Sequence, residues 1–248
     1  MEKVITYFGT DSGVGTTMIA QSVSENLTKE GKKVLLMLCS GNYGNDYIIT
    51  DEEASLDDIK ANLISGYLGK EDIEGILIKI NGLDIMPGIR DITRIKYYLE
   101  DDLDKIISVV RDDYDYIVID GGCNINYGIT VSSLLVADKI YFIITQQEKS
   151  IRRFINEYYS VLYPMKIEGR LISNKYVTDY GNHGISEIES FIGKEPAINV
   201  EYAKEGWIAE IRKTTLLSDA KFKAGIENIV SDITGIETKK SKFSFLSR

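Results

Sequence analysis

The chain has 248 residues, of which 44% are hydrophobic and 27% charged, and its formal net charge is −9 at pH 7. This length allows one large α/β domain whose core needs no disulfides or metals. The acidic charge argues against a protein built mainly to bind nucleic acid. One histidine argues against a histidine-based metal site or catalytic triad, and two cysteines are too few for a disulfide framework. No apolar run approaches the roughly 20 residues that span a bilayer, so we expect a soluble, cytoplasmic protein.

Short apolar runs alternate with longer helical patterns along the chain. In chain order they predict a strand at 4–8, a helix at 17–30, a strand at 34–38, a helix at 56–67, a hairpin at 78–85, a helix at 92–110, strands at 116–119 and 140–145, a helix at 150–163, a strand at 170–173, a helix at 185–192, a strand at 197–200 and a helix at 219–234. This alternation predicts an α/β fold with a doubly wound, mostly parallel sheet flanked by helices. No linker divides the pattern, so we expect one domain over 1–235 and a tail over 236–248.

The segment Gly9-Thr10-Asp11-Ser12-Gly13-Val14-Gly15-Thr16-Thr17 lies between the first predicted strand and helix. Backbone N–H groups and the start of a helix at such a place can bind phosphate, and the Thr17 hydroxyl could ligate Mg²⁺. Against the pattern G-x-x-x-x-G-K-[S/T], Gly15 and Thr17 fit, but Thr10 stands at the first glycine and Thr16 at the lysine. From this loop alone, a simple glycine turn between a strand and a helix is an equal alternative.

Four segments follow one another in the chain: this loop, Lys33-Val34-Leu35-Leu36, Asp115-Tyr116-Ile117-Val118-Ile119-Asp120 and Ala137-Asp138-Lys139-Ile140. In this order they resemble the MinD/ParA family of dimerising P-loop ATPases with a deviant Walker A loop. The resemblance covers roughly residues 1–235. The resemblance implies ATP or ADP with Mg²⁺ as cofactor, and a homodimer. It places Asp120 and Thr17 at the metal. It also places residues 146–150 where the family has its Thr-x-Pro-Glu-x-x-Ser segment after a strand. The residues that it implies bind the nucleotide are Asp11, Ser12, Gly13, Val14, Gly15, Thr16, Thr17 and, at the base, Asn174.

Three charged groups of the family are absent. Asp11 replaces the signature lysine that reaches a partner's phosphates, and Thr16 replaces the lysine that neutralises the β- and γ-phosphates. Leu38-Cys39-Ser40 replaces the segment whose first aspartate positions the attacking water. Asp11 would also repel a triphosphate unless a cation pairs with it. We therefore name no catalytic residue, and we expect weak nucleotide binding with little or no hydrolysis.

Divergent loops of this kind are frequent in the TadZ/CpaE branch of the family, which helps to localise pilus-assembly machinery. The resemblance thus favours a localisation or assembly factor whose protein partners belong to a membrane-associated assembly, with nucleic acid disfavoured. Two alternatives stay open: an active ATPase for septum placement or DNA partitioning, and a scaffold that binds no nucleotide. The basic, partly apolar tail at 239–248 resembles the membrane-targeting end of MinD-type proteins, which would place the protein at the inner face of the membrane. Its alternative is a solvated terminus.

Overall fold

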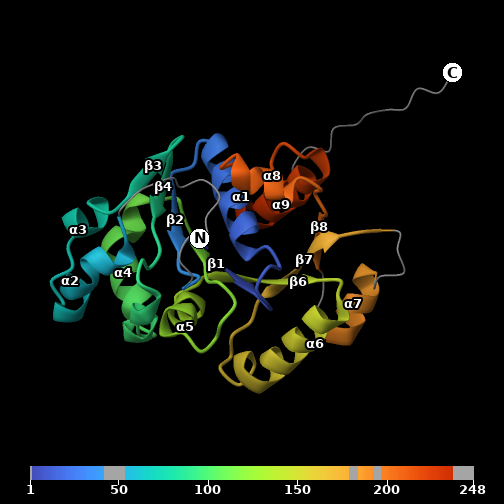
Figure 1. Cartoon of the computed structure of the whole chain (residues 1–248), viewed down its shortest axis with the longest axis horizontal. Coiled ribbons are helices and arrows are strands. Elements are labelled where there is room, and N and C mark those ends of the chain that lie inside the picture. The colour runs from blue at the N-terminus through green and yellow to red at the C-terminus, as the bar shows by residue number, and fades with distance from the viewer. Residues whose placement is uncertain (1, 42–53, 179–183, 193–196, 237–248) are drawn as a thin grey trace.

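The computed structural model describes residues 2–41, 54–178, 184–192 and 197–236. Over these residues it forms one eight-stranded sheet in the order β3-β4-β2-β5-β1-β6-β7-β8 (Figure 1). β3 runs antiparallel to β4, and the other neighbouring strands are parallel. The predicted α/β fold with a doubly wound, mostly parallel sheet is confirmed. The strands are β1 (Val4–Gly9), β2 (Val34–Leu38), β3 (Ile78–Ile80), β4 (Leu83–Met86), β5 (Tyr116–Asp120), β6 (Lys139–Thr145), β7 (Arg170–Tyr176) and β8 (Ile198–Glu201).

β1 lies inside the sheet, between β5 and β6. Every residue of β1 is buried. Ile5 and Tyr7 pack into the core on one face, whereas Val4 and Phe8 pack into the two cores of the other face. A strand covered on both faces needs apolar side chains at successive positions, which explains the apolar residues on both sides of Thr6. The register places Tyr7 opposite Asp120, so the carboxyl ends of β1 and β5 lie side by side.

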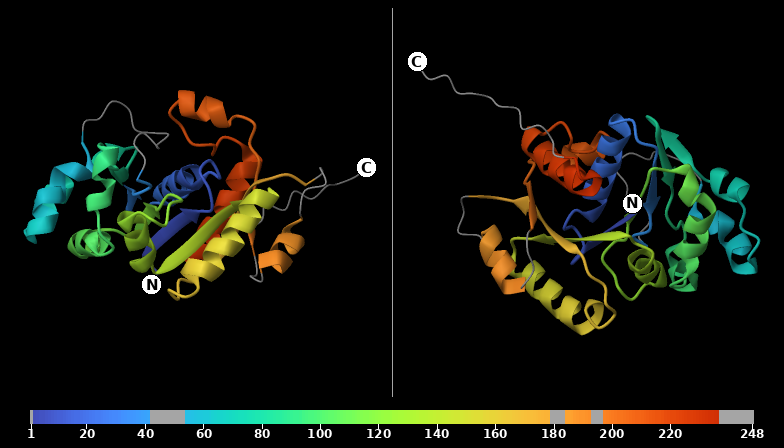
Figure 2. Two further views of the ribbon diagram at one scale, coloured as in Figure 1. Left: turned by 60° about the horizontal axis from the view of Figure 1, so that its bottom comes forward. Right: turned by 180° about the vertical axis from the view of Figure 1, so that it is seen from behind.

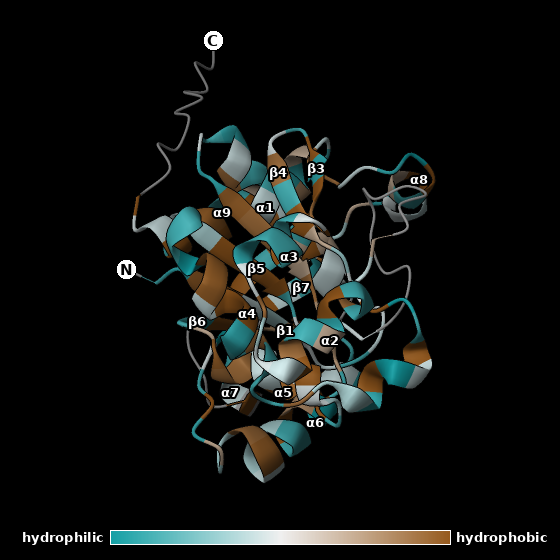
Figure 3. Ribbon diagram, turned by 90° about the vertical axis from the view of Figure 1, so that its left-hand side faces the viewer, coloured by the Kyte–Doolittle hydropathy of each residue, from teal (hydrophilic) through white to brown (hydrophobic). Residues whose placement is uncertain are grey.

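Helices cover both faces of the sheet (Figures 1 and 2). One face carries α1 (Thr16–Lys29) and α9 (Ala220–Thr234), which pack against each other, and the short α8 (Gly206–Ile211). Figure 3 shows mostly apolar strands enclosed between helices that also carry polar residues. The helices of the other face and its outer edge are α2 (Lys60–Ser65), α3 (Lys70–Glu74), α4 (Asp102–Val110), α5 (Gly128–Leu135), α6 (Glu148–Glu157) and α7 (Ile185–Ile192).

The prediction of a single helix over 92–110 is wrong. The segment contains a 3₁₀ helix, Ile92–Tyr97, and then α4, with extended backbone at Tyr98 between them. The ring of Tyr98 is buried, and its hydroxyl donates to Asp57 Oδ1 at 2.9 Å. The Asp102 carboxylate accepts the backbone N–H of Leu99 at 2.8 Å. Side-chain bonds of this kind compete with helical backbone bonds and end the helix.

The sequence patterns do not predict α3, α5 or α8. α3 and α8 have five and six residues, which is too short for an apolar period to be recognised. Among the described residues, the structure has no helix that is both long enough and apolar enough to span a membrane. The tail at 239–248 lies outside the described residues, so its membrane contact stays a prediction, as does the division into one domain and a tail.

Candidate functional site

The loop of residues 10–15 connects β1 to α1 at the carboxyl edge of the sheet. Gly13 and Gly15 adopt left-handed backbone conformations, with φ angles of 78° and 98°. Gly15 is the N-cap of α1, and no side chain caps the helix there. No side chain of the described residues therefore caps the first helical turn, and the positive end of the helix dipole lies at the loop. This arrangement is the one by which helices bind phosphate.

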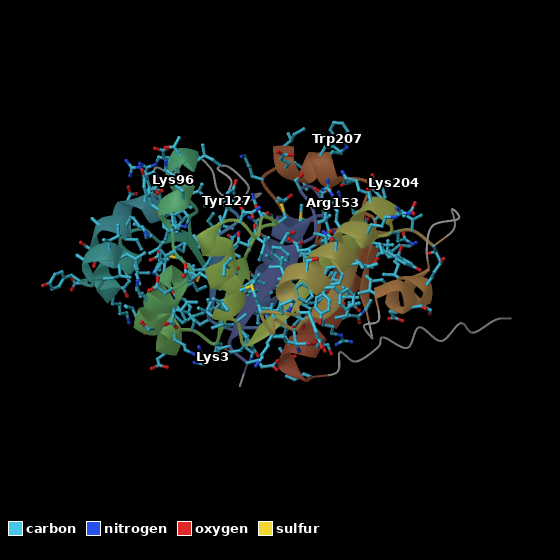
Figure 4. The ribbon with its side chains drawn as sticks, turned by 90° about the horizontal axis from the view of Figure 1, so that it is seen from below. Lys3, Lys96, Tyr127, Arg153, Lys204 and Trp207 are labelled. Atoms are coloured by element: carbon cyan, nitrogen blue, oxygen red, sulfur yellow. The ribbon has the colours of Figure 1, made fainter. Side chains whose placement is uncertain are left out.

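The residues predicted to hold nucleotide and metal meet at this edge. In Figure 4, which views the molecule from below, Arg153 and Trp207 lie in the upper half of the picture, whereas Lys3, which precedes β1, lies at the bottom. Five of the predicted residues lie in the loop, two begin α1, one ends β5 and one lies in β7, in the order Asp11, Ser12, Gly13, Val14, Gly15, Thr16, Thr17, Asp120 and Asn174.

Thr17 and Asp120 are in direct contact. The Thr17 hydroxyl donates to Asp120 Oδ2 at 2.6 Å, and the Gly122 N–H donates to Oδ1 at 3.1 Å. Burial raises the pKa of the fully buried Asp120 carboxyl to about 6, although both hydrogen bonds favour its charged form. Within the described part of the chain, no lysine or arginine pairs with this carboxylate. A buried carboxylate beside a hydroxyl oxygen fits the hard oxygen ligands that Mg²⁺ prefers.

The end of β7 holds the loop in place. The buried amide of Asn174 donates from Nδ2 to the Val14 carbonyl oxygen at 2.7 Å. Lys175 Nζ donates to the Gly13 carbonyl oxygen at 2.6 Å. A Cβ added at Gly15 would lie 2.3 Å from Asn174 Nδ2, so this contact requires glycine in the loop. Asn174 thus positions the loop and at the same time lines the pocket beside it.

A pocket of about 350 Å³ opens beside the loop. Apolar side chains from two helices and two partly exposed aromatic rings contribute to it, and Trp207 is 79% exposed. Pockets with apolar walls and a few polar groups are typical ligand sites, and aromatic rings can stack on a nucleotide base. The lining residues are Gly13, Gly15, Met18, Asn174, Lys175, Glu201, Tyr202, Ala203, Gly206, Trp207, Glu210, Leu216 and Phe222.

The sequence patterns miss this pocket, because its lining comes from segments far apart in the chain. One signal was available. Trp207 is the only tryptophan of the chain, and Ile208 and Ile211 follow it. Large apolar residues in a segment without a clear strand or helix period indicate a surface that contacts something else.

Asp11 is paired with two cations from α6. Lys149 Nζ lies 3.2 Å from Asp11 Oδ2, and Arg153 Nη1 contacts Oδ1. Burial alone would raise the pKa of Asp11, but the bonds from Lys149 and the Ser12 N–H and the charge of Arg153 outweigh it, so the pKa lies below its ordinary value. The negative charge that the sequence places in the loop is therefore compensated by this chain itself.

Thr16 and Leu38 stand at two positions where the resemblance implies a charged group, and both carry uncharged side chains. A Cβ added at Gly9 would lie 2.2 Å from Thr16 Oγ1, so the Thr16 hydroxyl is folded back over the end of β1. Leu38 is buried and lies in register opposite Asp120. Neither side chain carries a charge.

Residues 2–157, more than half of the chain, match the family model described as AAA domain. The chain belongs to the AAA domain family. A Methanocaldococcus jannaschii protein described as ATP-binding is 25% identical over 262 residues, which cover 99% of this AAA domain protein and 97% of that relative.

Two solved structures are similar to this AAA domain protein over nearly their whole length. The ParA family ATPase of Chlorobium tepidum has a TM-score of 0.80 at 19% identity, with 93% of this chain and 99% of that chain covered. The septum site-determining protein MinD of Pyrococcus horikoshii, in complex with Mg-ADP, has a TM-score of 0.73 at 16% identity, with 96% and 100% covered. The fold is therefore that of MinD/ParA-like ATP-binding proteins.

Proposed function

We propose that this AAA domain protein binds ADP or ATP together with Mg²⁺, hydrolyses ATP little or not at all, and acts as a localisation or assembly factor. The observation that carries the proposal is the Thr17–Asp120 hydrogen bond of 2.6 Å, next to a glycine loop at an uncapped helix start. The pocket beside the loop supports it, because it offers room for a base within reach of the phosphate site.

Residues of this chain would hold the phosphates, the metal and the base of the nucleotide. The backbone N–H groups from Gly13 to Thr17 would donate to phosphate oxygens. Mg²⁺, when bound, would neutralise phosphate charge, and Thr17 and Asp120 would hold it through their oxygens. The base would enter the pocket between the loop and α8, where Trp207 offers an aromatic face.

We expect slow ATP hydrolysis because of the residues at positions 16 and 38. Phosphoryl transfer depends on positioning and on charge stabilisation, and one missing cationic group can cost about 10³–10⁵ in rate. Thr16 turns its hydroxyl toward Gly9, and Leu38 is a buried apolar residue. Bound ATP would therefore stay intact and serve as a ligand that stabilises one state of the protein.

The role in assembly rests on α8. Trp207 and Ile211 are 79% and 80% exposed, and Trp207 also lines the pocket. A nucleotide in the pocket would contact the same helix that presents apolar side chains to solvent, so it could change how a partner protein binds. We propose a homodimer with protein partners in a membrane-associated assembly, such as pilus machinery, because the net charge of −9 disfavours DNA.

A single-turnover experiment tests this function. Excess protein is mixed with labelled ATP and Mg²⁺, and bound ATP and released ADP are both followed with time. We expect ATP to be retained by the wild type and cleaved no faster than in buffer, and Thr17→Ala to retain less ATP. Rapid cleavage would contradict the proposed lack of hydrolysis, whereas a failure to retain any ATP would contradict nucleotide binding.

A further inference from the structure

Lys149 and Arg153 form a pair of cations directed at the loop. They stand four residues apart on α6, so they project from the same face of the helix, and both contact the Asp11 carboxylate. Their side chains are 65% and 49% exposed, whereas that of Asp11 is 22% exposed. The cations can therefore be reached from solvent at the loop, and Figure 4 shows Arg153 on the same side of the molecule as Trp207.

The start of α6 is tied to the loop by hydrogen bonds that do not involve these cations. Ser150 Oγ and Thr10 Oγ1 lie 2.9 Å apart in a hydrogen bond. The Thr145 N–H donates to the same Ser150 oxygen at 3.0 Å. Because these groups are buried, α6 is held next to the loop even when the ion pairs to Asp11 break.

The neighbouring Arg152 differs from these two cations in its partner, so pairing with Asp11 is not common to every cation on this helix. Arg152 forms an ion pair with Glu148, four residues earlier on α6, and both side chains are largely exposed. Among the described residues, it forms no ion pair or hydrogen bond with the loop, although it is adjacent to Arg153 in the chain. Arg152 is thus a matched control of the same charge on the same helix.

The charges at the loop favour an anion. Asp11 contributes one negative charge and its two partners contribute two positive charges, so the cluster carries a net charge of +1. The positions where a P-loop lysine would neutralise phosphate hold Thr16 and Asp11 instead. A di- or triphosphate is a stronger anion than one carboxylate, and cations bind it through charge-assisted hydrogen bonds.

We propose that Lys149 and Arg153 neutralise the β- and γ-phosphates of the bound nucleotide, and that Asp11 occupies these cations in the empty site and competes with the phosphates. This inference rests on the proposed nucleotide-binding function. The positive charge that the loop lacks is supplied by α6, and Asp11 sets how much of it is available. Nucleotide binding then requires the two cations to leave the Asp11 carboxylate.

Calorimetric titration of the full chain with Mg-ATP, Mg-ADP and AMP tests the proposal. Asp11→Asn should raise the affinity for ATP and ADP about tenfold, since it frees both cations, and this gain should shrink at high salt. The double variant Lys149→Gln/Arg153→Gln should lower the affinity for both by about tenfold or more. AMP, which has no β- or γ-phosphate, should respond little to either change.

A combined variant and a control complete the design. In the Lys149→Gln/Arg153→Gln background, Asp11→Asn should give no gain, because no cations remain to be freed. Arg152→Gln should leave all affinities unchanged. Thermal unfolding of each variant shows whether it is folded, and the single variants Lys149→Gln and Arg153→Gln replace the double one if it is not.

The outcomes separate this inference from the function on which it rests. If ATP and ADP bind and Thr17→Ala weakens them, but changes at Asp11, Lys149 and Arg153 have no effect, the α6 cations are not phosphate ligands and the inference is wrong. An equal gain from Asp11→Asn with and without the cations would overturn it as well. If no variant, including Asp11→Asn, binds any of the nucleotides, the proposed function itself fails.

Discussion

Replacing Asp120 by asparagine should stabilise the protein at neutral pH in the absence of Mg²⁺. The Asp120 carboxyl is fully buried, and burial raises its pKa from the ordinary 3.8 to about 6. Holding it ionised at pH 7 therefore costs about 3 kcal/mol of folding free energy, at about 1.36 kcal/mol for each pH unit. Asparagine has nearly the same shape, and its amide can donate to the Thr17 oxygen in place of the present bond.

This cost has a defined pH window. A carboxyl whose pKa is higher in the folded than in the unfolded state stabilises the fold below its unfolded pKa, and this stability is lost as the pH rises through the folded pKa. Relative to Asp120→Asn, the wild type should therefore lose stability between about pH 4 and pH 7. Other carboxyls titrate in both proteins alike, so the difference between the two isolates Asp120.

Thermal unfolding of the wild type and Asp120→Asn across this pH range, without Mg²⁺, is the assay. We expect the variant to unfold roughly 6–12 °C higher at pH 7, since about 3 kcal/mol shifts the midpoint by roughly 2–4 °C per kcal/mol in a chain of this size, and this gap to close toward pH 4. Asp112→Asn, at an exposed aspartate, is the control and should show no such pH-dependent gap. A variant that is less stable than the wild type at pH 7, or a gap that is independent of pH, would refute the reasoning.

Three further predictions concern backbone packing, binding of the base and dimerisation. Gly122→Ala should destabilise the fold by about 3 kcal/mol, because its φ is +70° and the new Cβ would lie 2.7 Å from the Ser40 backbone. Gly13→Ala, with φ of +78° and open space around the new Cβ, should cost about 1 kcal/mol. Urea unfolding measures both costs, and equal costs would contradict the packing described. ADP should change the fluorescence of Trp207 while pyrophosphate should not, and Trp207→Ala should weaken ADP binding about tenfold; a pyrophosphate signal of equal size would place the base elsewhere. Dimer affinity measured by sedimentation should change little on addition of ATP, because Asp11 cannot reach a partner's phosphates as a lysine would; a chain that is monomeric alone and fully dimeric with ATP would contradict this.

The strands could be predicted from sequence because burial on both faces leaves a direct trace in the chain. The hairpin could be predicted for a different reason, namely its turn residues. Asn81 and Gly82 both adopt positive φ angles, of 52° and 85°, as a two-residue turn requires, and Ile80 pairs with Leu83 across it. Long-range side-chain bonds left no such trace. The break before α4 depends on Tyr98 reaching Asp57, and the apolar period of that segment continues through it.

In the candidate site, too, some residues could be predicted from the sequence and others could not. The loop could be located in advance from its glycines between a strand and a helix, and the resemblance to the MinD/ParA family implied the place of Asp120. Parallel strands bring their carboxyl ends to one edge, so the two lie close together. The partners of Asp11 could not, since Lys149 and Arg153 come from a helix more than a hundred residues later and nothing in their local pattern indicates the loop. The same holds for the pocket, whose aromatic residue Trp207 lies on a helix too short for its period to be recognised.

The most direct test of the account is the affinity of the wild type for ADP, measured by calorimetry with Mg²⁺ and with a chelator. The account predicts that ADP binds more tightly when Mg²⁺ is present, and that Thr17→Ala removes this gain while leaving the Mg²⁺-independent part of the affinity, because Thr17 acts through the metal that it shares with Asp120. An affinity that is the same with Mg²⁺ and with the chelator, and that Thr17→Ala does not change, would contradict the assignment of this edge of the sheet as a magnesium–nucleotide site.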